Sequence, residues 1–122
     1  MVKPYSSDRY DGVRPDIEVL SRRLKEFARQ RNWEQYHTPK NLVMALSVEA
    51  AELLEHFQWR SPEASSMLDS ATREEVAMEM ADVFIYLLRL AECLDIDLKA
   101  ATERKIAINE QRFPPGQQSD NS

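Results

Sequence analysis

The sequence predicts an all-α fold in which one chain forms a four-helix bundle-like protomer, and three observations lead to this prediction. Apolar residues recur at the spacing of helices, capping residues stand at the expected helix starts, and no stretch alternates as strands do. The 122 residues suffice for one domain with a core but not for two. We therefore expect a single domain over residues 16–113, after a flexible arm (1–15) and before a disordered tail (114–122).

Each expected helix has a recognisable start. Asp and Thr side chains accept hydrogen bonds from the first free backbone N–H groups of a helix, and proline suits the first helical position. The expected helices and their caps are 16–31 (Asp16), 38–59 (Thr38, followed by Pro39), 72–93 (Thr72, with Glu75 as a capping box) and 97–112 (Asp97). Residues 60–71 are expected to form a loop, and Pro114 and Pro115 stop the last helix.

Composition excludes several classes of protein. A net charge of −5 argues against general nucleic-acid binding, which needs a basic surface. With only two glycines, no Gly-rich phosphate loop exists, so any phosphate must be held by metal ions and side chains. The single cysteine, Cys93, excludes an internal disulfide, and we expect it to be a buried small hydrophobe. No apolar run is long enough for a membrane span, and no signal peptide is apparent, so a cytoplasmic protein is expected.

Two acidic pairs lie within otherwise apolar helices: Glu49 with Glu52, and Glu79 with Asp82. Residues three apart share one face of a helix, and carboxylates beside a core are costly unless a cation meets them. Oxygen-only ligands select Mg²⁺, Mn²⁺ or Ca²⁺. A di-iron site would need Glu-x-x-His on two helices, and neither acidic helix carries that pair. The sequence thus favours a hard-metal site that serves phosphate chemistry.

Helix 72–93 is apolar around most of its circumference, apart from one polar seam. Such a helix is normally buried, and four helices of this size cannot bury it alone, so we expect burial against another subunit. The seam consists of Glu75, Glu79, Asp82, Tyr86 and Arg89. The last helix carries Lys105, Asn109 and Arg112 on one face, which could meet an anionic ligand or could be a solvated face near a helix C-terminus.

In combination these features resemble the all-α nucleoside triphosphate pyrophosphatases of the MazG-like superfamily, and more closely their dCTP pyrophosphatase branch. The resemblance covers residues 17–114, nearly the whole expected domain. Two positions need comment: Val48 stands where many members have a further Glu, although the dCTP branch lacks it too, and Leu24 stands where eukaryotic dCTP enzymes have a His near the base pocket. The matching segments are 32–42, 49–59, 79–87 and Lys105 with 109–114.

The resemblance implies hydrolysis between the α- and β-phosphates of a nucleoside triphosphate, giving a monophosphate and pyrophosphate. It implies Mg²⁺ (or Mn²⁺) as cofactor and a homo-oligomer, with a tetramer favoured over a dimer. Implied metal ligands are Glu49, Glu52, Glu79 and Asp82, with Glu49 or Glu52 also taking the proton of the attacking water and Glu55 as an additional ligand. Implied substrate contacts are Lys105, Asn109 and Arg112 for the phosphates, Trp33, His37 and Trp59 for the base, and Tyr86 for the sugar.

Alternatives remain open at this point. A relative could act on another phosphoanhydride, such as dUTP or phosphoribosyl-ATP. In a non-catalytic helical interaction module, the acidic seams would only set the pairing of helices. Trp33 and Trp59 could equally be core or interface residues, and His37 could merely complete a turn.

Overall fold

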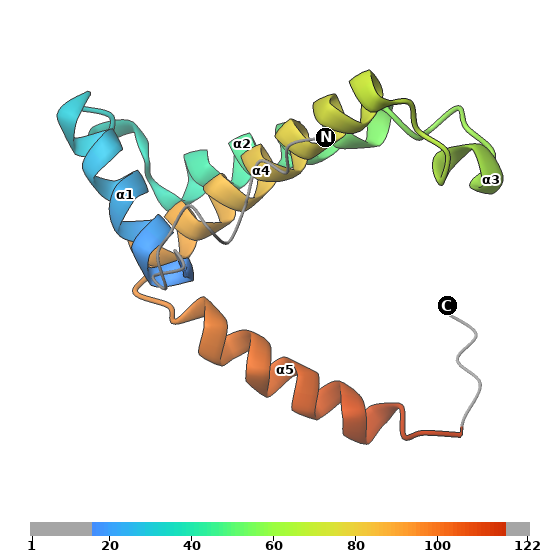
Figure 1. The fold of residues 1–122 in the computed structure, drawn as a ribbon. Coiled ribbons are helices and arrows are strands. Elements are labelled where there is room, and N and C mark those ends of the chain that lie inside the picture. Colours follow the sequence, from blue (N-terminus) through green and yellow to red (C-terminus); the bar gives the residue numbers. More distant parts are fainter. Residues whose placement is uncertain (1–15, 117–122) are drawn as a thin grey trace, which may run out of the picture.

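The computed structural model describes residues 16–116, and within this range every regular element is helical, which confirms the all-α prediction. The N-terminal arm and residues 117–122 of the expected tail lie outside the described residues. Figure 1 shows the arrangement. The elements are α1 (Ile17–Gln30), the short 3₁₀ helix η2 (Glu34–Tyr36), α2 (Pro39–Glu55), α3 (Pro62–Ser65), α4 (Ser70–Cys93) and α5 (Leu98–Arg112).

Helices α2 and α4 lie side by side and form the centre of the fold, with α1 packed on α4 (Figure 1). The pair is antiparallel, because His37 at the entrance to α2 contacts Arg89 and Cys93 at the far end of α4. The buried apolar residues of the described chain belong to these three helices: Ala28, Leu42, Val76, Leu88 and Ala91. This small core fixes the α2–α4 pair that carries both acidic motifs.

Local capping accounts for most helix starts. The side chains of Asp16, Thr38 and Asp97 accept hydrogen bonds from backbone N–H groups three residues on, as expected. The expected cap Thr72 is wrong: α4 begins two residues earlier, and Asp69 Oδ1 accepts from the backbone N–H of Thr72 at 2.7 Å. A carboxylate cap was available upstream, so Thr72 lies inside the helix.

The boundaries of the predicted loop also differ. Helix α2 ends at Glu55 rather than near Trp59, and the chain continues as turns. Within the expected loop, Pro62 starts the one-turn helix α3, which Ser61 caps through a hydrogen bond from the Ala64 N–H. A hydroxyl followed by proline is the same helix-start signal that opens α2.

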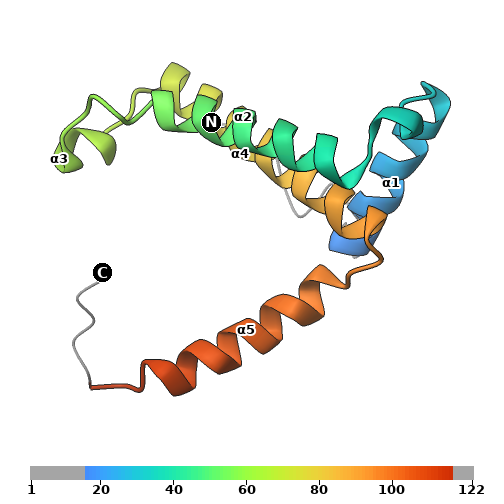
Figure 2. The ribbon, with the colours of Figure 1, turned by 180° about the vertical axis from the view of Figure 1, so that it is seen from behind.

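Helix α5 runs away from the α2–α4 pair in both views (Figures 1 and 2). A closed four-helix bundle within one chain is therefore not confirmed. The side chains of α5 are mostly exposed, including Ile106 at 54% and Ile108 at 49%. Among residues 16–116, no helix combines the length and the apolarity that crossing a lipid bilayer would require.

Candidate functional site

Three of the four expected metal-ligating carboxylates lie together where α2 faces α4. Glu49, Glu79 and Asp82 each offer one oxygen, and these oxygens lie within 4.8 Å of one another. The side chains are half-buried, between the apolar faces of the two helices. One residue of the first pair and both residues of the second thus converge from adjacent antiparallel helices, and Glu49, Glu79 and Asp82 are called the acidic cluster below.

Glu52, the fourth expected ligand, raises the pKa values of Glu49 and Glu79 in the acidic cluster. Burial first, then a hydrogen bond that protonated Glu49 donates to Glu52 and the charge of Glu52, raise the pKa of Glu49 from 4.5 to about 7, with Asp82 and Glu79 adding to the shift. Burial and Glu52 likewise raise the pKa of Glu79. Two carboxyl groups can hydrogen-bond only when one is protonated. Without a cation, and between about pH 4.5 and pH 7, Glu49 therefore keeps a proton that an isolated glutamate would have released.

The acidic cluster fits a hard divalent cation. Glu49 Oε2 and Glu79 Oε2 are buried and have no hydrogen-bond partner among the described residues. A buried carboxylate oxygen without a partner is unfavourable. Carboxylate oxygens that lie within 4.8 Å of one another match the ligand preference of Mg²⁺ or Mn²⁺. The acidic cluster with Glu52 could hold such an ion, which would lower the pKa values that burial raises.

The expected base-pocket residues Trp33 and His37 lie further along the pair, where α4 ends. Trp33 packs edge-on against Phe27 with ring centroids 5.5 Å apart, and its centroid lies 6.3 Å from that of His37. Since His37 contacts Arg89, seven residues beyond Asp82, this segment lies about two helical turns, or ~10 Å, from the acidic cluster. That span is comparable to the distance from a nucleobase to its phosphates.

Other expected substrate residues are dispersed within one chain. Trp59, beyond the end of α2, is 88% exposed, so one chain gives it no pocket. Lys105, Asn109 and Arg112 are exposed on α5, and among residues 16–116 no hydrogen bond or ion pair joins them to the acidic cluster. Tyr86 is half-buried and lies on α4 between Asp82 and Arg89. Glu55, expected as an additional ligand, is exposed at the end of α2.

A groove of about 910 Å³ opens elsewhere, between the start of α1 and the connection from α4 to α5. Acidic side chains line much of it, including Glu18, Glu92 and Asp95. No residue of the acidic cluster lines this groove.

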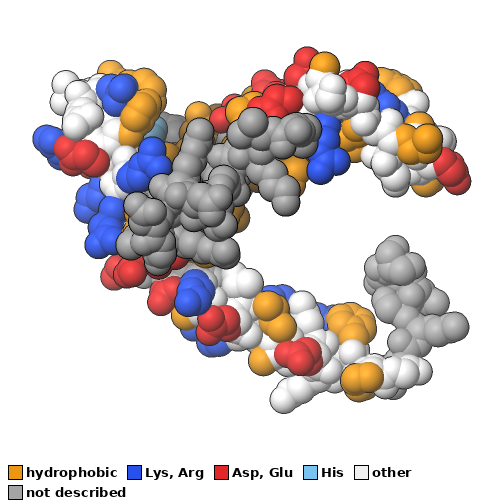
Figure 3. Space-filling view, in the orientation of Figure 1, with side chains coloured by type: hydrophobic (Ala, Val, Ile, Leu, Met, Phe, Trp, Pro, Cys, Tyr) orange, Lys and Arg blue, Asp and Glu red, His pale blue; other side chains and the backbone are white. Residues whose placement is uncertain are grey.

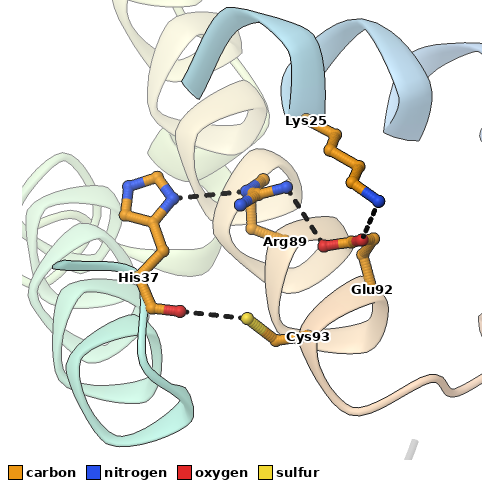
Figure 4. A network of polar contacts seen from close by, with 5 residues as sticks. All are labelled: Lys25, His37, Arg89, Glu92 and Cys93. Carbon is orange, nitrogen blue, oxygen red and sulfur yellow. Dashed lines mark hydrogen bonds and ion pairs between the residues drawn. The ribbon is translucent and has the colours of Figure 1, made fainter. Parts of the chain in front are cut away.

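The structure differs from the sequence-based expectation at Cys93, and it gives Arg89 contacts that the sequence did not predict. Cys93 is exposed rather than buried, and its thiol donates to the backbone carbonyl of His37 at 3.0 Å. Arg89, which had no assigned role in the polar seam, is only 4% exposed and binds His37 and Glu92 (Figure 4). A charged residue within the apolar end of α4 was the signal for such a partner, because a buried charge requires one.

Comparison with known proteins supports one assignment. The chain is 41% identical over 102 residues to human dCTP pyrophosphatase 1 and 42% identical over 105 residues to the mouse protein of that name. These matches cover 82% of this chain but only 60% of the relatives, so the chain spans about three fifths of their length. A crystal structure of a pyrophosphatase from Archaeoglobus fulgidus matches with a TM-score of 0.75 and 44% identity, over 80% of this chain and 92% of that one. Residues 44–122 match the MazG-like family. With both acidic motifs inside the matched region, the chain belongs to the MazG-like family.

Proposed function

We propose that this protein is a Mg²⁺-dependent nucleoside triphosphate pyrophosphohydrolase that cleaves a deoxynucleoside triphosphate, dCTP or a modified dCTP, to the monophosphate and pyrophosphate. Its role would be to remove unwanted nucleotides from the cytoplasmic pool. The observation that carries the proposal is the acidic cluster, in which each residue places a carboxylate oxygen within 4.8 Å of the others. In addition, Glu49 Oε2 and Glu79 Oε2 are buried without a hydrogen-bond partner among the described residues. The relatives named dCTP pyrophosphatase support the choice of substrate.

In this proposal Glu49, Glu52, Glu79 and Asp82 hold the metal. When bound, Mg²⁺ supplies Lewis-acid polarisation of the phosphates and lowers the pKa of a coordinated water. Glu49 or Glu52 takes a proton from the attacking water, which adds across the α–β phosphoanhydride bond and releases pyrophosphate. The raised pKa of Glu49, about 7 in the absence of metal, supports a role for this position in proton transfer.

The remaining residues bind the substrate. Trp33 and His37 contact the base and Tyr86 packs on the sugar, which extends the nucleotide along α4 from the acidic cluster toward Arg89. Trp59 lies beyond the opposite end of α2 from His37, so its contact with the base comes from a second copy. Lys105, Arg112 and Asn109 donate to the phosphates and offset their charge. Because α5 diverges from the acidic cluster in its own chain (Figures 1 and 2), we propose that these three residues meet the acidic cluster of a second copy.

The exposed apolar surface supports a homo-oligomer, with a tetramer favoured. Large hydrophobic side chains are exposed on α2, α4 and α5. Figure 3 shows hydrophobic side chains at the surface along α5. Full burial of a large apolar side chain is worth ~1.5–3 kcal/mol. Because these side chains are 38–57% exposed, covering each of them with a second copy gains roughly half of that. The exposed large hydrophobic residues on these three helices include Met44, Val48, Leu54, Met78, Met80, Phe84, Ile106 and Ile108.

Pyrophosphate release across a nucleotide panel tests the function. With Mg²⁺ we expect dCTP and 5-methyl-dCTP to be hydrolysed at higher kcat/KM than dUTP, dATP or phosphoribosyl-ATP, and we expect no turnover after chelation by EDTA. Preference for dUTP or phosphoribosyl-ATP would reassign the substrate within the same chemistry. No pyrophosphate from any substrate would support the non-catalytic interaction module.

The raised pKa of Glu49 predicts how pH and metal act on stability. Its pKa rises from an ordinary 4.5 to about 7 on folding. The folded state therefore binds its proton more tightly, so this contribution to stability is full below pH 4.5 and is lost as the pH rises through 7. Mg²⁺ replaces the proton and adds ~1.4 kcal/mol for each tenfold excess over its Kd.

Thermal unfolding at pH 5.5 and pH 8.0, with and without Mg²⁺, measures this effect. We expect Mg²⁺ to raise the midpoint more at pH 8.0 than at pH 5.5. The pKa of His37 is lowered by burial and by Arg89, so the contribution of His37 to stability increases with pH, opposite to that of Glu49. Comparing metal-bound with metal-free samples at the same pH cancels the contribution of His37. An equal Mg²⁺ effect at both pH values would show that no proton is displaced.

A further inference from the structure

Arg89 is a buried charge that the proposed reaction does not use. Its side chain is 5% exposed, and a guanidinium can only donate hydrogen bonds. Nε donates to His37 Nδ1 at 3.3 Å, and Nη1 donates to Glu92 Oε2 at 3.2 Å (Figure 4). The other carboxylate oxygen of Glu92 pairs with Lys25 Nζ at 3.3 Å, so α1, α4 and the entrance to α2 are joined through one network.

The contact with Arg89 determines the protonation of His37. Nδ1 accepts from Arg89, so it carries no proton, and a neutral imidazole must then carry its proton on Nε2. A second proton on Nδ1 would face an N–H group of a cation. The backbone of His37 is held as well, because its carbonyl accepts from Cys93 Sγ at 3.0 Å.

The charges around the ring favour the same form. Burial, then the charge of Arg89, lower the pKa of His37, and Glu34 opposes them. Glu92 also lies near, but both of its oxygens are engaged by Arg89 and Lys25. His37 therefore stays neutral at pH 7, and the ring has one N–H, on the nitrogen that points away from Arg89 (Figure 4).

We infer that Arg89 is a positioning residue for the nucleobase, because it fixes His37 beside Trp33 as a neutral ring with a hydrogen-bond donor on Nε2. This inference rests on the proposed function, in which Trp33 and His37 line the base pocket. A fixed donor selects a base edge that presents an acceptor, such as N3 of cytosine, over one that presents N–H, such as N3 of uracil. It also keeps His37 out of proton transfer.

Nitrogen NMR of the histidine rings tests the tautomer without reference to activity. The chain has two histidines, His37 and His56, and His56→Gln assigns the signals. In the wild type we expect His37 in the Nε2–H form at pH 7–8. Arg89→Met should give a mixture of tautomers and a higher pKa. Lys25→Met is the matched control, because it breaks the pair with Glu92 and leaves the contact between Arg89 and His37 in place.

Kinetics test the effect on the base. In Arg89→Met we expect KM for dCTP to rise about fivefold to tenfold, as for one impaired hydrogen bond, with kcat changed by less than about twofold. Preference for dCTP over dUTP should fall by a similar factor. Arg89→Lys keeps the charge but lacks the planar fork, so it should be intermediate, and it serves as the test variant should Arg89→Met not fold.

The outcomes separate this inference from the proposed function. A wild type that hydrolyses no nucleotide would overturn the function and this inference with it. An active wild type whose His37 signals are unchanged in the Arg89 variants would overturn the inference alone. So would altered signals with an unchanged KM, or a loss confined to kcat.

Discussion

Replacing Glu79 by Gln is expected to lower kcat by about 10²–10³-fold while the protein stays folded and assembled. Glu79 lies in the acidic cluster with Glu49 and Asp82, and its Oε2 is buried without a partner. Glutamine preserves size and hydrogen bonding but removes the charge that a divalent cation needs. Pyrophosphate release under saturating dCTP and Mg²⁺ measures the loss, and size-exclusion chromatography verifies the assembly.

The same substitution should have an opposite effect on the metal-free fold. The carboxylate oxygens of the acidic cluster lie within 4.8 Å of one another, so their charges repel when no cation is bound. Removing one charge from the acidic cluster therefore raises the unfolding midpoint without Mg²⁺ and reduces the further rise that Mg²⁺ gives. Glu74→Gln, an exposed position on the same helix, is the matched control and should change neither quantity. Normal turnover in Glu79→Gln would remove Glu79 from the metal site.

The helices and the proximity of the acidic residues could be predicted because both depend on short-range rules. Side-chain caps at Asp16, Thr38 and Asp97 act within one turn, and they start the helices where expected. Pairs spaced three apart share a face by helix geometry alone. The failure at Thr72 is also local, because Asp69 offers a charged acceptor one turn earlier. A competing cap nearby is the kind of alternative that a single pattern cannot resolve.

The network around Arg89 could not be predicted in the same way. It joins residues 52 positions apart, and only the antiparallel pairing of α2 with α4 brings His37 to Arg89. A charge in the apolar end of α4 needs a partner, but helix periodicity does not identify that partner. The exposure of Cys93 has a related cause, since it belongs to the last turn of α4, where its thiol reaches the entrance to α2.

The direction of α5 is the largest feature that the sequence left undetermined. Its apolar residues, such as Ile106 and Ile108, predict a helix that packs on something, but within one chain they remain half-exposed. Helical periodicity reports that a face is apolar without saying whether the same chain or another covers it. In one chain the basic residues of α5 lie apart from the acidic cluster. We therefore propose a composite site, in which the basic residues of one copy meet the acidic cluster of a second copy.

Replacing Lys105 by Met is expected to lower kcat/KM by about 10²-fold, because one cation that offsets phosphate charge is lost. Since Lys105 is exposed on α5 and outside the acidic cluster, the Mg²⁺-dependent rise in unfolding midpoint should be unchanged. Lys105→Met thus loses turnover alone, whereas Glu79→Gln loses both turnover and the Mg²⁺-dependent rise in the unfolding midpoint. Steady-state kinetics with dCTP and thermal unfolding with Mg²⁺ measure the two effects.

Mixing two inactive variants then tests whether Lys105 and the acidic cluster come from different subunits. When Glu79→Gln and Lys105→Met chains are coexpressed, half of the paired subunits are mixed, and each mixed pair has one intact site of two. We expect about a quarter of wild-type activity to return. Glu79→Gln mixed with Asp82→Asn is the control: both changes fall in the same acidic cluster, so no mixed pair has an intact site. Recovery absent from both mixtures would place Lys105 and the acidic cluster in one chain, against the composite site.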